Sequence, residues 1–451
     1  MLNTSTNKGR LITLNASSIK LLPWLGNTFI DALSPVFSAT SLIFFLTYTI
    51  NCLGNETDSA IQKPGQESVV ESFDKIWLKA NEYYYSESLR KRQFTDEKYL
   101  QLKAQAKQKN NIHEFSPVFN EFLKSLNVSH TQFYTSNDID FYFFRSLFST
   151  REINKPKVFH IGGQFKQVNN QYIVREVLDG YPLDQAGIRR GDIIENVDDG
   201  EFHPYLSFNQ TIKPHYRLRI NRNGRQFVKS ISPVFENPSY SFAQSVKHSA
   251  KIIKLNDKRV GYVRLWTGVH ADVLQSFTQV IKTQFESVDG IILDLRGGYG
   301  GAWYEYIDPF FTNRQAYFNY SVIDKAGNRK QYTAEDKNNP SPFLGPMVVL
   351  INEGVRSGKE ALSYQFKKTN RALLVGEKTM GAFVAGRGIF NEEQDYFLYL
   401  ATAEYFVDDI KIEGVGIKPH VAVAYPLSKS LNHDPQLNRA LVEISKLLND
   451  K

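Results

Sequence analysis

Cysteine is almost absent from this chain of 451 residues, in which Cys52 is the single example. One cysteine excludes an intramolecular disulfide and any metal site built on cysteine ligands. The nine histidines are scattered, and none forms a His-x-x-x-His pair that would place two ligands on one helix face. We therefore expect neither a metal ion nor another cofactor.

The chain also lacks a block of basic residues with interleaved aromatic side chains, although its formal net charge is +7. Lys and Arg are interspersed with Asp and Glu, which gives little support to nucleic-acid binding. The composition is ordinary for a globular protein, with 42% hydrophobic and 22% charged residues. Because one core rarely holds so many residues, two or three domains are expected.

Charged residues are missing from residues 32–55, and basic residues precede this apolar stretch. We expect residues 1–34 to form a basic leader, residues 35–51 a signal peptide or membrane anchor, and residues 52–67 a linker. The rest of the chain would then be exported, to the periplasm or cell envelope. A buried helix is the alternative, because the apolar part is short. Cys52 suggests lipidation, although Asn51 is not the small residue that such processing favours.

Residues 68–150 show helical periodicity and are expected to form an N-terminal helical domain. Ser68 and Glu71 fit a capping box at the start of an amphipathic helix. Residues 95–107 predict a second helix, and Ser116-Pro117 is expected to open a third. His130 follows the third helix. A histidine in such a place is commonly a hydrogen-bonded structural residue, and a catalytic role is the alternative.

Residues 157–236 alternate short strands with turns, and their most specific run is Gln185 to Ile194. This run resembles the Ala-Gly-Ile-x-x-Gly-Asp-x-Ile segment in the PDZ domains of bacterial peptidases. The resemblance implies that an extended peptide adds to a strand edge, with its terminal carboxylate held by backbone N–H groups. The matching loop is residues 160–165, with Ile161, Gly162 and Gly163 at its centre. A small β domain without a ligand is the alternative.

Residues 288–301 combine a continuous apolar strand with Asp294-Leu295-Arg296 and a glycine-rich turn that includes Gly300 and Gly301. Glycine in such a turn lets the backbone approach a ligand closely. One chemistry that needs this approach is an oxyanion hole. A phosphate-binding loop is the competing interpretation, but the Gly-Lys-Ser/Thr ending and a clean Gly-x-Gly-x-x-Gly spacing are both missing.

Residues 348–362 join a run typical of a buried strand to a helix-competent segment, and Ser357 lies at the junction. Backbone N–H groups and the positive end of the helix dipole would stabilise negative charge that develops beside the Ser357 hydroxyl. A nucleophilic serine needs this setting. The alternative is that Ser357 only caps the helix.

Together these motifs resemble the C-terminal processing and tricorn-core peptidase family, in the family's order from about Ser68 to the last helix. The segments that carry the resemblance are Leu126 to Tyr134, Asp294-Leu295-Arg296, Ser357 in Asn-Glu-Gly-x-x-Ser-x-x-Glu, residues 371–381 and Glu413 to His420. Val128 and His420 stand where the family usually has Asp. The resemblance implies an α+β multi-domain chain, with an N-terminal helical segment, a PDZ-like β domain and a crotonase-like α/β serine peptidase core over residues 237–451.

The same resemblance implies that Ser357 is the nucleophile and that the N–H of Gly358, with one from Gly300 or Gly301, stabilises the oxyanion. It does not supply the general base that a serine needs. Ala382 occupies the lysine position of the processing branch. Arg264, which cannot accept a proton, occupies the histidine position of the tricorn branch, whose supporting glutamate matches Glu413.

The remaining base candidates are His130, which we prefer, and His270, because a histidine is readily neutral at pH 7. Two functions follow. The chain is either a serine-type endopeptidase that cleaves extended or unstructured polypeptides with accessible C-termini, or an inactive relative that binds peptides as an adaptor. A membrane contact is expected only through the N-terminal segment.

Overall fold

The computed structural model describes residues 68–148, 156–391 and 395–450. The expected basic leader, signal or anchor segment, linker and Cys52 lie outside these residues. Within the described ranges, no helix combines the length and the apolar character needed to cross a membrane.

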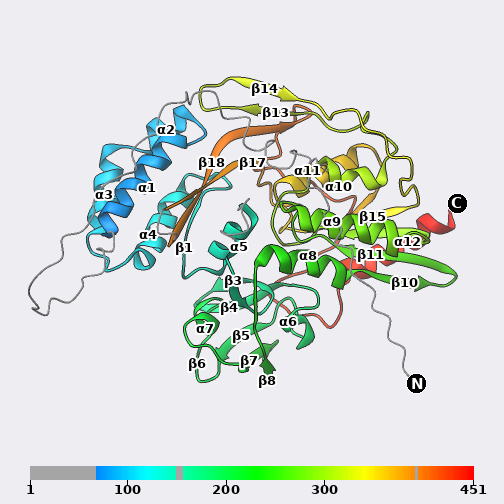
Figure 1. Cartoon of the computed structure of the whole chain (residues 1–451), viewed down its shortest axis with the longest axis horizontal. Coiled ribbons are helices and arrows are strands. Elements are labelled where there is room, and N and C mark those ends of the chain that lie inside the picture. The colour runs from blue at the N-terminus through cyan, green and yellow to red at the C-terminus, as the bar shows by residue number, and fades with distance from the viewer. Residues whose placement is uncertain (1–67, 149–155, 392–394, 451) are drawn as a thin grey trace, which may run out of the picture. The chain divides into compact units, whose positions relative to one another are not determined.

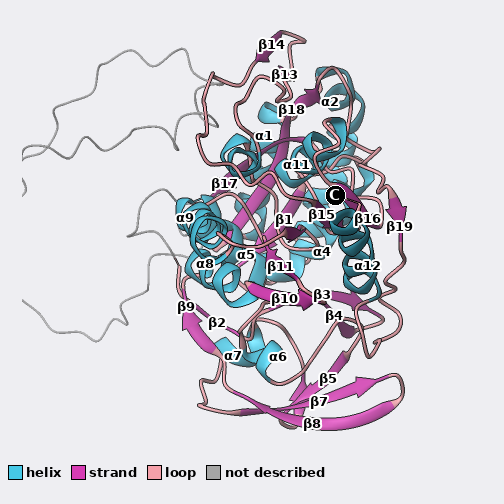
Figure 2. Ribbon diagram, turned by 90° about the vertical axis from the view of Figure 1, so that its right-hand side faces the viewer, coloured by secondary structure: helices cyan, strands magenta, loops and turns pink. Residues whose placement is uncertain are grey.

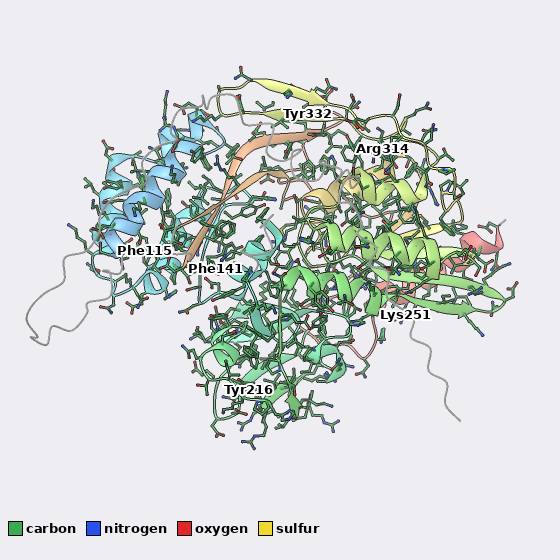
Figure 3. The ribbon with its side chains drawn as sticks, in the orientation of Figure 1. Phe115, Phe141, Tyr216, Lys251, Arg314 and Tyr332 are labelled. Atoms are coloured by element: carbon green, nitrogen blue, oxygen red, sulfur yellow. The ribbon has the colours of Figure 1, made fainter. Side chains whose placement is uncertain are left out.

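The described chain opens with helices α1 (Val69–Tyr83), α2 (Glu87–Gln93), α3 (Asp96–Ala106) and α4 (Ile112–Ser125). The expected capping box is present, because the Glu71 carboxylate accepts from the Ser68 N–H at 2.9 Å and the Ser68 hydroxyl from the Glu71 N–H at 3.2 Å. The helices share an aromatic core that includes Phe115, labelled in Figure 3.

The expected third helix begins about one turn earlier than Ser116-Pro117. The Asn111 side chain accepts a hydrogen bond from the Glu114 N–H at 3.0 Å and so caps α4 before Ile112. Pro117 then lies inside the helix.

The segment after these helices joins the C-terminal part of the chain. Strand β1 (Gln132–Thr135) pairs antiparallel with β18 (Tyr396–Val407), and α5 (Ile139–Phe148) follows β1. The sheet order is β1-β18-β13-β14, with β13 (Tyr320–Ile323), β14 (Arg329–Tyr332) and, also paired with β18, β17 (Val384–Phe390). Figure 1 shows β18 running from the N-terminal helices toward β13. This pairing brings His130, just before β1, close to the C-terminal motifs.

Residues 157–236 form a strand-rich segment. Its elements are β2 (Val158–His160), β3 (Gly163–Val168), β4 (Gln171–Val177), α6 (Pro182–Gln185), β5 (Ile193–Val197), β6 (Gly200–Glu201), α7 (Leu206–Asn209), β7 (Tyr216–Arg222), β8 (Arg225–Ile231) and β9 (Val234–Glu236). The sheet order is β3-β4-β5-β7-β8, with β6 on β5, and β2 pairs with β9 (Figure 2). Buried apolar residues such as Leu218 and Ile220 form a separate core cluster here.

The C-terminal part is built on a central sheet in the order β10-β11-β12-β15-β16-β19. Its elements are α8 (Pro238–Ser249), β10 (Lys251–Leu255), β11 (Lys258–Arg264), α9 (Ala271–Gln279), a π-helical turn (Val280–Gln284), β12 (Gly290–Asp294), α10 (Tyr304–Ile307), a 3-10 turn (Asp308–Phe310), β15 (Met347–Ile351), α11 (Gly358–Lys368), β16 (Leu373–Gly376), β19 (Val421–Ala422) and α12 (Pro435–Asn449). Strand β10 is antiparallel to β11, and the strands from β11 to β19 are parallel.

Both faces of the central sheet are buried, which explains the continuous apolar runs in its strands. Leu293 and Val349 belong to the large core that also includes residues of α8, α9 and α11. Ile292 and Val348 point to the opposite face, where they pack with Ile444 of α12. Because β11, β12, β15 and β16 are parallel, their carboxyl ends lie at one edge of the sheet. Arg264, Asp294 and the turn before Ser357 all lie at that edge.

Candidate active site

Ser357 lies at the N-cap of α11 in a strained backbone conformation, with φ 56° and ψ −134°. Among the described non-glycine residues with positive φ, all but three are Asn or Asp, the side chains that tolerate this region best. The three exceptions are His130, Ala302 and Ser357, with φ values of 54°, 70° and 56°. Strain of this kind persists only where the surrounding structure imposes it, and it clusters at functional sites.

A network of hydrogen bonds fixes the Ser357 backbone. Its N–H donates to the Ala382 carbonyl at 2.8 Å and to the Glu360 carboxylate at 3.2 Å. The same carboxylate accepts from the Thr379 hydroxyl at 2.6 Å and from the N–H groups of Gly381 and Ala382 at 2.7 and 2.8 Å. Burial raises the pKa of Glu360 to about 7, although the hydrogen bonds from these donors act to lower it. Glu360 therefore ties the serine turn to residues 379–382, a role that sequence reasoning missed.

The glycine turn after β12 lies directly against Ser357. A Cβ atom on Gly300 would lie 2.5 Å from the Ser357 Cβ and 3.1 Å from its Oγ. A Cβ on Gly358 would lie 2.2 Å from the Gly301 carbonyl oxygen. The Gly300 carbonyl accepts from the Thr267 hydroxyl at 2.9 Å, which holds the turn in place. The three residues expected to form the oxyanion hole therefore meet at Ser357.

His130 is linked to Glu413 through Ser129. The Ser129 hydroxyl lies 2.8 Å from His130 Nδ1 and 2.8 Å from Glu413 Oε2. An ionised carboxylate only accepts, so the hydroxyl donates to Glu413 and accepts from Nδ1–H of His130. In this tautomer, which the hydrogen bonds assign, Nε2 of His130 carries the free lone pair. The sequence motif contained Ser129 immediately before His130, but only the fold reveals its bridging position.

Further contacts connect Glu413 to the segment that binds the Ser357 backbone. The Phe383 N–H donates to Glu413 Oε2 at 2.6 Å, and Phe383 follows Ala382, whose carbonyl accepts from the Ser357 N–H. Burial, and then the positive charge of Arg356, lower the pKa of His130 to about 3. The imidazole is therefore neutral at pH 7.

The other residues considered for proton transfer have different surroundings. His270 caps α9, with its Nδ1 accepting from the Asp272 N–H at 3.2 Å. Arg264 is buried and pairs with Glu176 at 2.5 Å. Position 382 lies next to Ser357, since the Ala382 carbonyl accepts from the Ser357 N–H, but alanine offers no basic group there.

Lys359 is a fully buried residue of this site that sequence reasoning missed. Its Nζ donates to the carbonyl oxygens of Gly297, Leu295 and Trp266 at 2.5, 3.0 and 3.2 Å. Burial lowers the pKa of Lys359 well below its ordinary value. The side chain therefore holds the base of the glycine turn from the first turn of α11. The helical position two residues after Ser357 gave no signal of this burial.

The strand-rich segment contacts the glycine turn and the sheet edge. The Gln164 side chain accepts from the Gly298 N–H at 2.9 Å and donates to the Gly298 carbonyl at 3.3 Å. Glu176 of β4 is buried and accepts from Arg264 at 2.5 Å, Arg190 at 3.2 Å and Asn352 at 3.0 Å. A charged network thus joins this segment to the strands that carry the site.

The loop expected to hold a peptide carboxylate is closely packed on one side. Ile161 is buried, and its carbonyl accepts from the Leu183 N–H at 3.0 Å. Gly162 has φ 77°, and a Cβ atom there would lie 2.4 Å from the Tyr181 Cβ. Gly163 begins β3, so the loop leads directly into an edge strand of its sheet.

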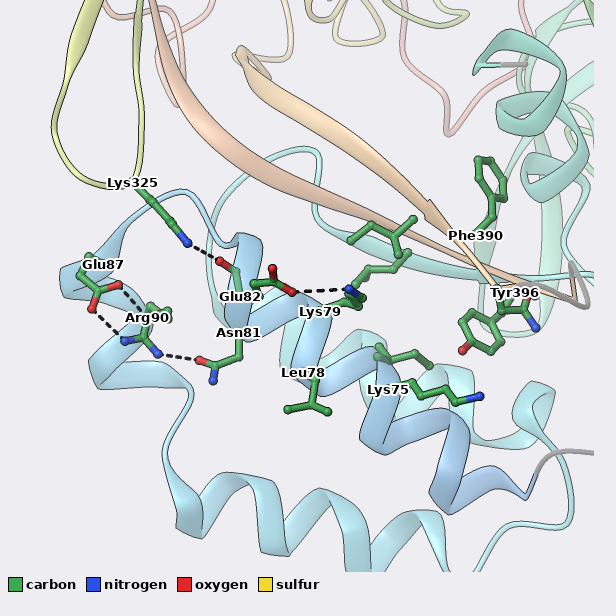
Figure 4. A pocket seen from close by; sticks show the side chains of 14 residues that line it. Lys75, Leu78, Lys79, Asn81, Glu82, Glu87, Arg90, Lys325, Phe390 and Tyr396 are labelled. Atoms are coloured by element: carbon green, nitrogen blue, oxygen red, sulfur yellow. Dashed lines mark hydrogen bonds and ion pairs between the residues drawn. The ribbon is translucent and has the colours of Figure 1, made fainter. Parts of the chain in front are cut away.

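A cavity of about 810 Å³ lies between α1, α2 and the ends of β17 and β18 (Figure 4). Its charged walls are largely paired, with Arg90 bonded to Glu87 and Asn81, and Lys325 to the Glu82 carbonyl. None of its lining residues belongs to the site at Ser357. Across the described part of the chain, no cluster of His, Cys, Asp and Glu has the arrangement of a metal site.

Comparison with known proteins agrees with this geometry. Residues 259–423 match the family model of peptidase family S41. The carboxyl-terminal-processing protease of Synechocystis sp. is 28% identical over 268 residues, which are 57% of this chain and 60% of that protein. The chloroplastic carboxyl-terminal-processing peptidase 2 of Arabidopsis thaliana is 25% identical over 276 residues, 58% of this chain and 51% of that protein. The chain thus spans only part of the length of these relatives.

A solved structure supports the fold. The photosystem II D1 C-terminal processing protease superposes with a TM-score of 0.51 and 18% identity, over 79% of this chain and 94% of that chain. Residues 259–423 therefore match a peptidase family S41 domain, and the chain's resemblance to the C-terminal processing peptidases is confirmed. The mixed α+β, multi-domain fold class is confirmed as well.

Proposed function

We propose that this protein is a serine-type peptidase that cleaves extended or unstructured polypeptides, with Ser357 as nucleophile and His130 as general base. The observation that carries the proposal is the line of hydrogen bonds from Glu413 through Ser129 to His130, with Glu413 also accepting from Phe383, the neighbour of the Ala382 that binds the Ser357 N–H. This arrangement supports a site with a nucleophile, an oriented base and oxyanion donors.

In the proposed reaction, Ser357 Oγ attacks the carbonyl carbon of the scissile peptide bond while Nε2 of His130 accepts the hydroxyl proton. Glu413, acting through Ser129, stabilises the imidazolium that forms. The N–H of Gly358 and one from the Gly300-Gly301 turn stabilise the oxyanion. The intermediate collapses when His130 returns the proton to the departing amine, and water then hydrolyses the acyl-enzyme by the same steps in reverse order.

The proposal includes capture of the substrate by a PDZ-like domain over residues 157–236. Strand β3 lies at the end of its sheet and has β4 as its strand neighbour, so its other edge is open to an added peptide strand. Residues 160–165, with Ile161, Gly162 and Gly163, would hold the terminal carboxylate. Gln164, at the start of β3 next to this loop, contacts the glycine turn, which supports delivery of the captured chain toward Ser357.

We also propose the domain division and location that the sequence predicts. Residues 68–150 would be the N-terminal helical domain and residues 237–451 the core, of the crotonase-like type. Export, with or without a membrane anchor, rests only on the composition of residues 1–51.

The proposal is tested by incubating the purified protein with an unstructured polypeptide that has a free apolar C-terminus. We expect fragments in mass spectra, and we expect a fluorophosphonate probe to modify Ser357 covalently. The alternative function, a peptide-binding adaptor, is favoured by one observation: alanine and arginine occupy the two family base positions. Saturable peptide binding without fragments or labelling would support the adaptor and contradict the peptidase.

The pH dependence identifies the base. Because the pKa of His130 is lowered to about 3, the imidazole stays able to accept a proton far below pH 6.5. We expect kcat/KM to keep its plateau through pH 5 while circular dichroism reports a folded protein. Arg356→Gln removes one cause of the lowering and should move the acidic limb to higher pH. A limb near pH 7 that this substitution does not move would instead indicate Glu360.

A further inference from the structure

Arg356 directly precedes Ser357, and its guanidinium stacks on aromatic rings of the site. The guanidinium carbon lies 4.9 Å from the centroid of the Tyr299 ring and 6.0 Å from that of Phe144. Tyr299 belongs to the glycine turn that contacts Ser357. The positive charge of Arg356 also acts on His130, whose pKa it lowers after the larger effect of burial. Arg356 therefore contacts the glycine turn and is close enough to His130 to influence its pKa.

The other arginines around this sheet edge all have carboxylate partners. The pairs are Arg175 with Glu353 at 3.8 Å, Arg190 with Glu176 at 3.2 Å, Arg264 with Glu176 at 2.5 Å and Arg296 with Asp294 at 2.6 Å. Among the described residues, no carboxylate forms an ion pair with Arg356 and no side chain or carbonyl accepts a hydrogen bond from it. The carboxylate of Asp140, beyond Tyr299, is bonded to the Tyr299 hydroxyl.

Helix stability does not explain an arginine at this position. A cation just before the N-cap of α11 opposes the helix dipole, which favours negative charge at this end. Stacking on Tyr299 covers one face of the guanidinium. Its N–H donors lie in the plane of the guanidinium and remain without acceptors. The side chain is half-buried next to Ser357 in the chain, so its unpaired donors are partly withdrawn from solvent.

We propose that Arg356 binds a carboxylate of the substrate polypeptide close to the scissile bond, so that acidic substrates are preferred. This inference rests on the proposed peptidase function. A guanidinium presents two parallel N–H donors that match the two oxygens of a carboxylate, and such bidentate pairs are strong in partly desolvated sites. The carboxylate comes either from an Asp or Glu side chain or from the C-terminus of the chain being cleaved.

The test uses matched peptides that differ only in charge. One pair exchanges Glu for Gln within three residues of a cleavage site that the wild type reveals in an unstructured polypeptide. A second pair exchanges a free C-terminal carboxylate for an amide at the same distance. For wild type, Arg356→Gln and the control Arg387→Gln, kcat/KM is measured on each pair. Arg387 is also stacked on a tyrosine, Tyr83 at 4.5 Å, but lies on β17 outside the site.

We expect the wild type to favour the charged member of one pair about tenfold or more, which corresponds to a charge-assisted hydrogen bond. Arg356→Gln should reduce this ratio to near one, and Arg387→Gln should keep it. A preference in the Glu/Gln pair identifies a side-chain carboxylate, and one in the second pair identifies the C-terminus. Equal ratios in wild type and Arg356→Gln overturn the inference while leaving the peptidase function intact.

Binding measurements separate this inference from the peptidase function. The same pairs are titrated against the Ser357→Ala variant, alone and combined with Arg356→Gln, with dissociation constants read from fluorescence anisotropy. Tighter binding of the charged peptide that depends on Arg356 supports the carboxylate site even if no peptide is cleaved. Cleavage or binding that ignores the charge contradicts it.

Discussion

Replacing His130 with alanine is expected to lower kcat/KM on unstructured peptides by a factor on the order of 10⁴ to 10⁶, about as much as replacing Ser357. A hydroxyl without an oriented base is a poor nucleophile at pH 7, and a base without the hydroxyl has no proton to accept. Because the two groups act as one unit, the double variant should lose no more than either single variant. The measurement is kcat/KM for the three variants on one peptide.

The control for this experiment is His270→Ala, because His270 caps α9. This variant should keep most of its activity and lose at most a little stability, as is usual for the removal of a helix cap. If His130→Ala retained activity while His270→Ala lost it, our assignment of the base would be wrong. Multiplicative losses in the double variant would show that His130 and Ser357 contribute independently.

Glu176→Gln is expected to be the most destabilising single substitution outside the nucleophile turn. The Glu176 carboxylate is buried and neutralises two arginines, Arg264 and Arg190, so its loss leaves positive charge uncompensated away from water. Breaking a buried pair in this way costs about 3 to 5 kcal/mol of unfolding free energy. Urea denaturation, followed by tryptophan fluorescence, gives the free energy of unfolding for wild type and variant.

Glu353→Gln is the matched control, because Glu353 pairs with the same Arg190 at 2.8 Å but its side chain is 44% exposed. An exposed pair contributes about 1 kcal/mol or less. Equal destabilisation by the two substitutions would show that burial of Glu176 is not what makes its ion pairs important. Because Glu176 lies on β4 and Arg264 on β11, Glu176→Gln should also loosen the strand-rich segment from the sheet edge.

The sequence predicted the parts of the fold that local patterns encode. The capping box at Ser68 and Glu71, the apolar strand before Asp294 and the helix after Ser357 depend on neighbours a few residues away, and the structure contains each of them. The start of α4 was misplaced, because the capping side chain of Asn111 competes with the Pro117 signal. Local patterns cannot decide between two such starts.

The residues of the candidate site show the same difference between local and long-range patterns. Ser357 and the glycines belong to short continuous motifs, so sequence reasoning found them. The bridge through Ser129 joins residues 284 positions apart, and no local spacing encodes it. Burial of Lys359 depends on three carbonyls from two loops that follow β11 and β12, so no local pattern predicted it.

The hydrogen bond between Ser129 and Glu413 also has a consequence for the time at which a newly made chain becomes active. A ribosome that has just passed Ser357 has completed the nucleophile turn, but the residue that orients His130 is still to be translated. At about 5 to 20 residues per second, Glu413 follows Ser357 by several seconds. If His130 is the base, as we propose, Ser357 would have no oriented base during this interval with which to cut the growing polypeptide.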